Sequence, residues 1–283
     1  MATKEATVLP KAEMKILLLG LPLTNTASLT TALRHLGHNP YTMRNLASSP
    51  SHIDIWTSAI PSSSHTASTL PLALTNILSA HDSVADLPAC MFAPQLIAAY
   101  PHAKVILTTR ESSEWERAMQ NSIGQLFTSR LFVLARLTNL SQMAPLIRLL
   151  HALFGMHNGN IYSGPEARHA AEAHNTLIRG LVPQERLLEI DAAEDVGWDT
   201  LEAFLGEGGK RPEGKAFPRV KEEEPMRKGL EAAWGAMARY LVLMVGLNGV
   251  VVALSVAAWV YAEELRGVRD VWVLGPVKAY LEK

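Results

Sequence analysis

Disulfides and a strong net charge are both missing from this sequence. Its 283 residues include one cysteine, Cys90, which excludes a disulfide framework and suits a reducing compartment. The 26 lysines and arginines against 27 acidic residues leave a formal charge of -1, so we expect no nucleic-acid partner. No apolar run precedes Ile16, and we expect no signal peptide. These features together place the main domain in the cytosol.

Two common site patterns are also absent. His169 and His174 fall on one predicted helix, but their spacing does not put both on one face, so no metal site is expected. The loop after the first apolar run lacks the Gly-Lys-Ser/Thr ending of a nucleoside triphosphatase, because Asn25 and Thr26 stand there. This loop therefore has no lysine that could reach a phosphate.

What the sequence does contain is a strand, loop and helix pattern near its start. Residues 15–19 are apolar enough for a strand buried on both faces, and Gly20 and Pro22 end it. The polar residues 24–28 can cap a following helix, and Asn25 tolerates a positive φ. Backbone N–H groups at such a turn form an anion site, so the expected ligand is a phosphate. The alternative is an ordinary first turn of a parallel sheet.

More strands follow, separated by helical segments. Short strands are predicted near residues 41–43 and within 82–88, and buried ones at 104–108 and 187–190. Residues 89–100 are expected to form one amphipathic helix kinked near Pro94. This alternation predicts a three-layer α/β fold with a parallel sheet, whose ligands lie at the carboxyl ends of the strands.

The last part of the chain has a different composition. Residues 240–262 carry no charge and, at ~1.5 Å per helical residue, would span roughly 34 Å, enough for a bilayer core. We predict one transmembrane helix there; a helix buried in the protein is the alternative. The expected order is a flexible 1–13, a main domain 14–220, a linker 221–239, the span and a tail 263–283. Basic residues flank both ends of the span, so the cytosolic placement of the main domain rests on the cysteine and the missing signal peptide.

Several blocks of the main domain carry a family likeness. They are Gly-Leu-Pro-Leu-Thr-Asn-Thr-Ala-Ser-Leu at 20–29, Asp-Leu-Pro-Ala at 86–89, Tyr-Pro-His-Ala-Lys-Val-Ile-Leu-Thr-Thr-Arg at 100–110 with Trp115, His174-Asn175, Phe-Leu-Gly at 204–206 and Phe-Pro at 217–218. Over roughly residues 14–220 the sequence resembles the fungal sulfotransferase-like P-loop family.

The resemblance implies a three-layer parallel-sheet P-loop domain that binds 3'-phosphoadenosine-5'-phosphosulfate, abbreviated PAPS. The implied cofactor-binding residues are Gly20, Thr24, Asn25, Thr26, Ala27, Ser28 and Arg110. Arg110 matches the family's arginine that binds the 3'-phosphate, and its guanidinium suits a pair of hydrogen bonds with phosphate oxygens.

The sequence also departs from the family pattern. Leu23 stands where the family usually has a basic residue, Asn25 where it has glycine, and Ala118 where it has a serine. Losing the loop cation removes one source of charge neutralisation in group transfer. The catalytic candidates are Asp86, which could accept a proton, and His174, which matches the family's His-Asn pair. A helix cap or salt bridge is the alternative for Asp86, and a hydrogen-bonded helix residue the alternative for His174.

The sequence therefore predicts a tailoring enzyme that acts on a lipophilic small molecule in fungal secondary metabolism. A single span would hold it in an intracellular membrane, expected to be the endoplasmic reticulum. By default the reaction is sulfuryl transfer from PAPS to a hydroxyl, without a metal. The alternatives are a cofactor-independent cyclase, isomerase or dehydratase on the same scaffold, or a non-catalytic membrane scaffold for pathway enzymes.

Overall fold

The computed structural model describes residues 13–60, 70–129, 132–133, 144–194, 196–206, 208, 211–221, 223–269 and 272. The chain forms two compact units, Met1–Leu230 and Glu231–Lys283. The expectations for residues 1–12 and for most of the tail after Arg269 lie outside the described residues.

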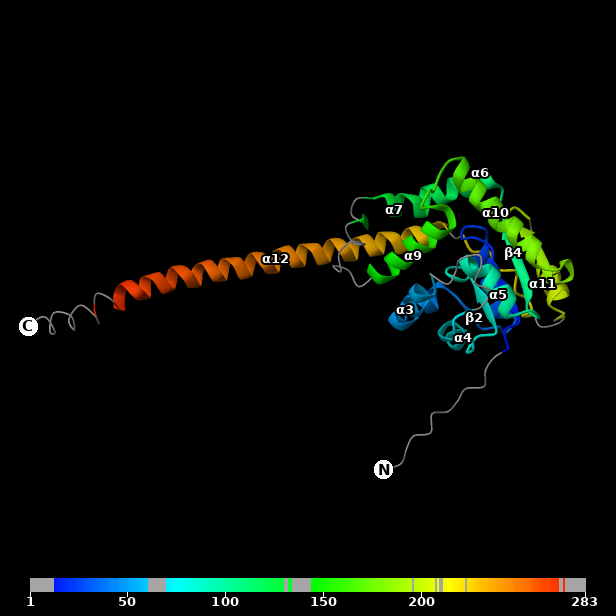
Figure 1. Ribbon diagram of the computed structural model, residues 1–283, viewed down its shortest axis with the longest axis horizontal. Coiled ribbons are helices and arrows are strands. Elements are labelled where there is room, and N and C mark those ends of the chain that lie inside the picture. The colour runs from blue at the N-terminus through cyan, green and yellow to red at the C-terminus, as the bar shows by residue number, and fades with distance from the viewer. Residues whose placement is uncertain are drawn as a thin grey trace, which may run out of the picture. The chain divides into compact units, whose positions relative to one another are not determined.

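The first unit is built on a parallel sheet of five strands (Figure 1). The strands are β1 (Ile16–Leu18), β2 (Pro40–Tyr41), β3 (Ser83–Ala85), β4 (Lys104–Thr109) and β5 (Leu187–Asp191). Their order is β2-β3-β1-β4-β5, and every neighbouring pair is parallel. The chain builds the sheet to one side of β1 and then crosses to the other, so the order reverses between β1 and β4. In an open α/β sheet, ligands bind at the carboxyl ends beside such a reversal.

Helices cover both faces of this sheet, which confirms the predicted three-layer α/β fold. The α-helices are α1 (Thr26–His35), α2 (Met43–Ala47), α3 (Pro50–Ala59), α4 (Leu72–Leu78), α5 (Ala93–Ala99), α6 (Ser112–Met119), α7 (Gln125–Thr128), α9 (Ala144–Asn158), α10 (Pro165–Leu181), α11 (Trp198–Leu205) and α12 (Glu223–Arg269). Two short 3-10 helices are η2 (Ala89–Phe92) and η4 (Gln184–Arg186), and η3 (Gln120–Gly124) is a π-helix.

Buried side chains on the two faces of the sheet contact different helices. Ile16 and Leu18 of β1 pack in one buried cluster with Leu33 of α1 and Leu201 of α11. Leu17 lies between them in the strand and points to the opposite face, because side chains alternate along a strand. On that opposite face α10 contacts both β4 and α5. All three β1 residues are buried, as a strand covered on both sides requires.

Local structure differs from expectation at two places in this unit. Residues 89–100 do not form one kinked helix: the 3-10 turn η2 comes first, and α5 starts with Pro94 in its first turn. Proline is tolerated there because the first N–H groups of a helix have no intrahelical partner. The short second strand is Pro40–Tyr41, and Met43 already begins α2, whose capping box is formed by Thr42 and Asn45.

The segment predicted as a linker, residues 221–239, is helical over most of its length. Residues 223–239 are helical and continue without a break into the apolar segment as α12. Glutamate, alanine, methionine and arginine recur in this stretch and favour helix, which accounts for the continuity. Within α12, Ala238–Gly267 is long and apolar enough to cross a membrane.

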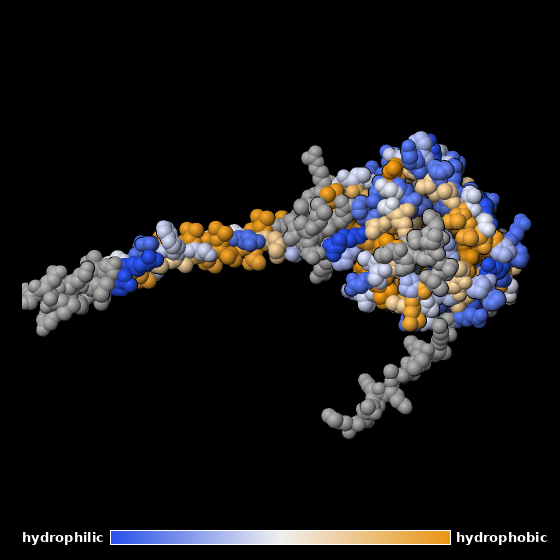
Figure 2. All heavy atoms as spheres, viewed as in Figure 1, coloured by the Kyte–Doolittle hydropathy of each residue, from blue (hydrophilic) through white to orange (hydrophobic). Residues whose placement is uncertain are grey.

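The side chains of this segment are exposed rather than buried. Val242, Leu254 and Trp259 each leave more than half of their surface uncovered. Figure 2 shows the apolar residues along the middle of α12 and polar residues toward its carboxyl end. A helix from a soluble core would have these side chains buried.

Candidate functional site

The loop after β1 is pressed against β4 at Gly20. A Cβ atom at this position would lie 2.7 Å from the carbonyl oxygen of Thr108 and would also overlap its side chain. Only glycine therefore allows the loop to leave the sheet along this path. Further on, Leu23 and Asn25 both have a positive φ, of 69° and 71°. Asn25 was expected to take this conformation, but Leu23 was not.

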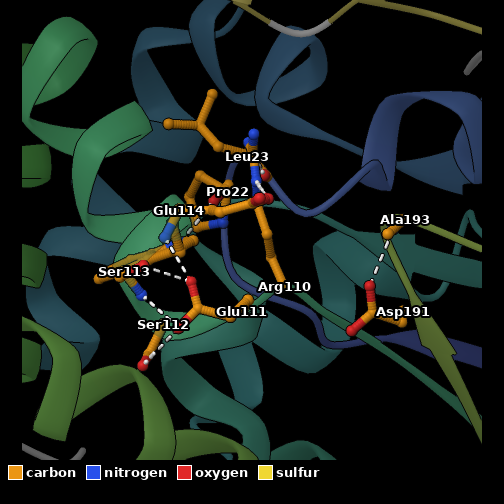
Figure 3. Close-up of polar contacts among 10 residues, drawn as sticks. Pro22, Leu23, Arg110, Glu111, Ser112, Ser113, Glu114, Asp191 and Ala193 are labelled. Atoms are coloured by element: carbon orange, nitrogen blue, oxygen red, sulfur yellow. Dashed lines mark hydrogen bonds and ion pairs between the residues drawn. The ribbon is translucent and has the colours of Figure 1, made fainter.

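Side chains from distant elements hold the loop by its carbonyl groups. The indole of Trp115 donates to the Pro22 oxygen at 2.9 Å, and Arg110 Nη1 donates to the Leu23 oxygen at 3.2 Å. Figure 3 shows Arg110 reaching from the end of β4 to the loop at Leu23. Because these donors hold an unusual backbone conformation, the loop is fixed before any ligand binds.

The hydroxyl of Thr24 serves the same purpose inside the loop. It donates to the Leu21 oxygen at 2.6 Å and lies 2.6 Å from the hydroxyl of Thr108. Thr24 is buried. Any contact between this residue and a ligand would therefore be made by its backbone N–H.

A cavity of about 500 Å³ opens beside the loop. We call it the cationic cavity, because its lining residues include Arg110, Arg219 and Lys221. The remaining lining residues are Leu23, Asn25, Ser28, Glu114, Ala192, Ala193 and Val220. Glu114 is the acid among them, and its carboxylate lies 3.6 Å from Arg110 Nε. Three cations against one acid suit an anionic ligand, and the volume is typical of a small-molecule site.

Glu111 beside this cavity caps α6 rather than offering a ligand contact. Its carboxylate accepts from the hydroxyl and N–H of Ser113 and from the Glu114 N–H, and these hydrogen bonds lower its pKa to about 2 (Figure 3). The cap fixes the first turn of α6, which carries Glu114. Asp191, at the end of β5, similarly accepts from the Ala193 N–H at 2.8 Å.

Arg219 and Lys221 are the site residues that the sequence did not identify. They lie almost at the end of the expected main domain, close to the Phe217-Pro218 block of the family likeness. The Val220 N–H between them donates to Ser28 Oγ at 2.9 Å and ties this segment to α1. The basic residues on either side of Val220 were the only signal in the sequence.

Asp86 lies at the neighbouring strand end. Leu18 is in register with Ala85, so Asp86 directly after β3 is level with Leu19 at the base of the loop. It has a φ of 66° and is half-buried. Burial raises the pKa of the Cys90 thiol, and the negative charge of Asp86 raises it further. Asp86 is thus close to the loop but is not among the residues that line the cationic cavity.

His174 contacts the loop from α10. Its Nε2 lies 2.9 Å from the Leu19 oxygen and donates to it, since a carbonyl can only accept. Burial lowers the pKa of this imidazole, although the bond to Leu19 acts in the opposite direction. His174 is therefore neutral with its proton on Nε2, and it supports the start of the loop.

The sequence-predicted residues thus take different places around one loop. Asn25, Ser28 and Arg110 line the cationic cavity. Gly20 and Thr24 shape the loop, and Thr26 and Ala27 begin α1. The fold is that of an α/β domain, and the cationic cavity lies beside the loop after its first strand.

Comparison with known proteins identifies the family. The family model described as the sulfotransferase domain matches residues 15–226, and the chain belongs to this family. The Ava biosynthesis cluster protein M of Aspergillus versicolor is 34% identical over 200 residues, covering 68% of this chain and 76% of that protein. A crystal structure of a sulfotransferase from Alicyclobacillus acidocaldarius matches with 17% identity and a TM-score of 0.39, over 82% of this chain and 96% of that one.

Proposed function

We propose that this protein is a tailoring enzyme of fungal secondary metabolism that transfers a sulfuryl group from PAPS to a hydroxyl of an apolar small molecule. Family membership supports the reaction class, and the biosynthesis-cluster name of the Aspergillus relative supports the metabolic setting. The observation that carries the proposal is the cationic cavity, which Arg110, Arg219 and Lys221 line together with residues of the loop.

The cavity residues fit the donor's charge. PAPS carries phosphate groups at two ends, and arginine can bind a phosphate through two parallel hydrogen bonds. Arg219 and Lys221 come from a segment unrelated to the loop and supply positive charge that Leu23 does not. We assign Arg110 and the first turn of α1 to phosphate binding, with Arg219 and Lys221 neutralising charge.

Sulfuryl transfer also needs a group that takes the hydroxyl proton. When bound, the donor supplies an activated sulfuryl group: the acceptor oxygen bonds to its sulfur as the sulfur–oxygen bond to phosphate breaks. Asp86, level with the base of the loop, is our candidate to accept the proton. Arg110 would offset the charge that develops on the leaving phosphate. His174 is assigned a positioning role, because its Nε2 proton is donated to the carbonyl oxygen of Leu19.

The apolar substrate is proposed together with the membrane. The Ala238–Gly267 segment would anchor the protein in an intracellular membrane, which we propose is the endoplasmic reticulum, with the main domain in the cytosol. Lipophilic molecules partition into such a membrane, so an anchored site would meet them there.

Calorimetric titration of the full chain in lipid nanodiscs with 3',5'-adenosine bisphosphate, the desulfated donor, tests the proposal. We expect micromolar binding, and an Arg110→Ala variant should bind about 100-fold more weakly because a charged hydrogen-bonding group is lost. Arg211→Ala is the matched control, since Arg211 pairs with Asp199 at 2.7 Å and does not line the cavity. A folded wild-type protein that does not bind the bisphosphate would refute PAPS as the donor.

Leu23 favours a second candidate, a cofactor-independent cyclase, isomerase or dehydratase. At the position where the family usually has a basic residue, this chain has an apolar side chain that is only 3% exposed. This candidate predicts turnover by dialysed protein without nucleotide, lost in Asp86→Asn. Turnover that requires added PAPS would exclude it.

A further inference from the structure

Two residues with small polar side chains, Asn248 and Ser255, interrupt the uncharged run 240–262 of α12. At ~1.5 Å per helical residue, Asn248 lies roughly 12 Å along the helix from the first residue of this run, and Ser255 lies roughly 10 Å from its last. Both side chains are exposed. In the proposed anchor, both would therefore lie within the hydrocarbon core of the membrane.

The two side chains differ in how far their own helix satisfies them. Ser255 Oγ donates its one proton to the Val251 oxygen at 2.8 Å. Asn248 Nδ2 donates to the Met244 oxygen at 2.7 Å, and this is its one hydrogen bond among the described residues. An asparagine amide has a second N–H and a carbonyl oxygen as well. Lipid chains offer no hydrogen-bonding group, so a polar partner at the same depth would lower the free energy of Asn248.

Asn248 and Ser255 lie on one face of α12, because seven residues make almost two helical turns. Met244, Val251 and Ala258 continue this face at alternating spacings of four and three residues. We call these five residues the asparagine seam. In the single chain, the described residues leave all five at least partly exposed. The spacing is the heptad pattern of helices that pack side by side along one face.

A second copy of α12 would supply the partner that this face lacks. The amide of Asn248 both donates and accepts, so two asparagines that face each other can hydrogen-bond in both directions. Copies of one chain insert into a membrane in the same orientation, which brings their asparagines to the same depth. The small side chains of Ser255 and Ala258 allow two helices to approach closely.

We propose that α12 pairs with α12 of a second copy as a parallel dimer, in which the Asn248 amides of the two chains hydrogen-bond across the asparagine seam. An asparagine at one position of such a seam fixes the register and the number of helices. The proposal rests on the membrane anchor proposed above, but not on sulfuryl transfer. The pair would tether two main domains to one place in the membrane.

Energy transfer between donor-labelled and acceptor-labelled full chains in phosphatidylcholine liposomes tests the pairing. On dilution with lipid, transfer in the wild type should stay above the level that random proximity gives. Asn248→Leu should weaken association about tenfold, because amide hydrogen bonds between the helices are lost. Asn248→Gln keeps an amide and should restore most of the association. Val250→Leu, an apolar change outside the seam, should have no effect.

Single introduced cysteines locate the contact. The chain's one cysteine, Cys90, is buried, so oxidised wild type should remain without a disulfide between copies. Val251→Cys lies on the seam and should crosslink the two chains on mild oxidation. Val250→Cys is the matched control, because it lies one residue earlier and outside the seam; the two valines are 54% and 55% exposed in the single chain.

Flotation of the liposomes tests the anchor separately. A chain that does not float with them refutes the anchor and the pairing together, whereas a chain that floats but shows only random transfer overturns the pairing alone. The pairing is also overturned if Asn248→Leu associates as tightly as the wild type, or if the two cysteine variants crosslink equally.

Discussion

The cationic cavity and a second cavity lie near the same loop, yet their lining residues differ in charge. The second cavity measures about 200 Å³ and lies between the η2–α5 segment and helices α9 and α10. None of the described residues that line it is Lys, Arg, Asp or Glu, and we call it the neutral cavity. Leu23 and Asn25 contribute to the first, and His174, which holds the Leu19 carbonyl, contributes to the second. Arginine and lysine line the cationic cavity, and the Arg110 side chain there is 26% exposed. In the neutral cavity burial removes the charge from both histidines. The cationic cavity therefore suits anionic ligands, whereas burial leaves the neutral cavity without a charge to pair with one.

The largest expected effect comes from the shared loop itself. Gly20→Ala would place a Cβ within 2.7 Å of the Thr108 carbonyl oxygen, which is backbone and cannot move aside. We expect it to destabilise the domain by about 3 kcal/mol and to impair both cavities. Thermal and urea unfolding measure the loss. Gly180→Ala is the control, since nothing lies within 4 Å of its new Cβ; an equal effect of the two substitutions would contradict the close packing at Gly20.

Charge removal should then weaken ligand binding in the cationic cavity. Arg219→Ala combined with Lys221→Ala should weaken binding of 3',5'-adenosine bisphosphate about 30-fold and reduce its salt dependence, because two cations leave the cavity. If nucleotide affinity and its salt dependence do not change in calorimetry, these residues do not face the ligand.

Low pH should act mainly on the neutral cavity. Because the folded-state pKa values of His157 and His174 are lowered, the unfolded chain binds more protons below the ordinary histidine pKa of about 6.5. Stability is then full above about pH 6.5 and falls as the pH decreases, by up to ~1.4 kcal/mol per pH unit for each histidine. Urea unfolding between pH 8 and pH 5 measures this slope. His157→Gln should reduce it, and an unchanged slope would show that His157 does not titrate in this way.

The smallest effect is expected at Thr24. Thr24→Val keeps the shape of the side chain but removes its hydrogen bonds to Leu21 and Thr108, at a cost of about 1 kcal/mol. Affinity for 3',5'-adenosine bisphosphate should change less than about twofold, since the hydroxyl faces the loop interior. A large loss of affinity without loss of stability would mean that the hydroxyl contacts the ligand directly.

Local sequence was sufficient for the parts of the protein that depend on neighbouring residues. The apolar runs at β1, β4 and β5 specify buried parallel strands, and Asn25 was recognised as a residue for positive φ. Arg110 could be placed at a strand end because strand ends are visible as a change from apolar to polar residues. The uncharged run within α12 is likewise visible in composition alone.

Only the tertiary structure revealed the rest, because it depends on which distant segments meet. Arg219 and Lys221 reach the loop through the hydrogen bond from Val220 to Ser28, a pairing across most of the domain that no local pattern encodes. No local pattern encodes the hydrogen bond from Trp115 to the Pro22 carbonyl oxygen, or the one from His174 to the Leu19 carbonyl oxygen. The neutral cavity was invisible in the sequence, since Gln95 was predicted in a helix and His157 in a loop, and only the fold places both on one cavity wall. The sequence by itself thus determined the strands, the loop and the apolar helix, whereas tertiary packing decided which side chains lie around the loop, because that depends on which distant segments meet.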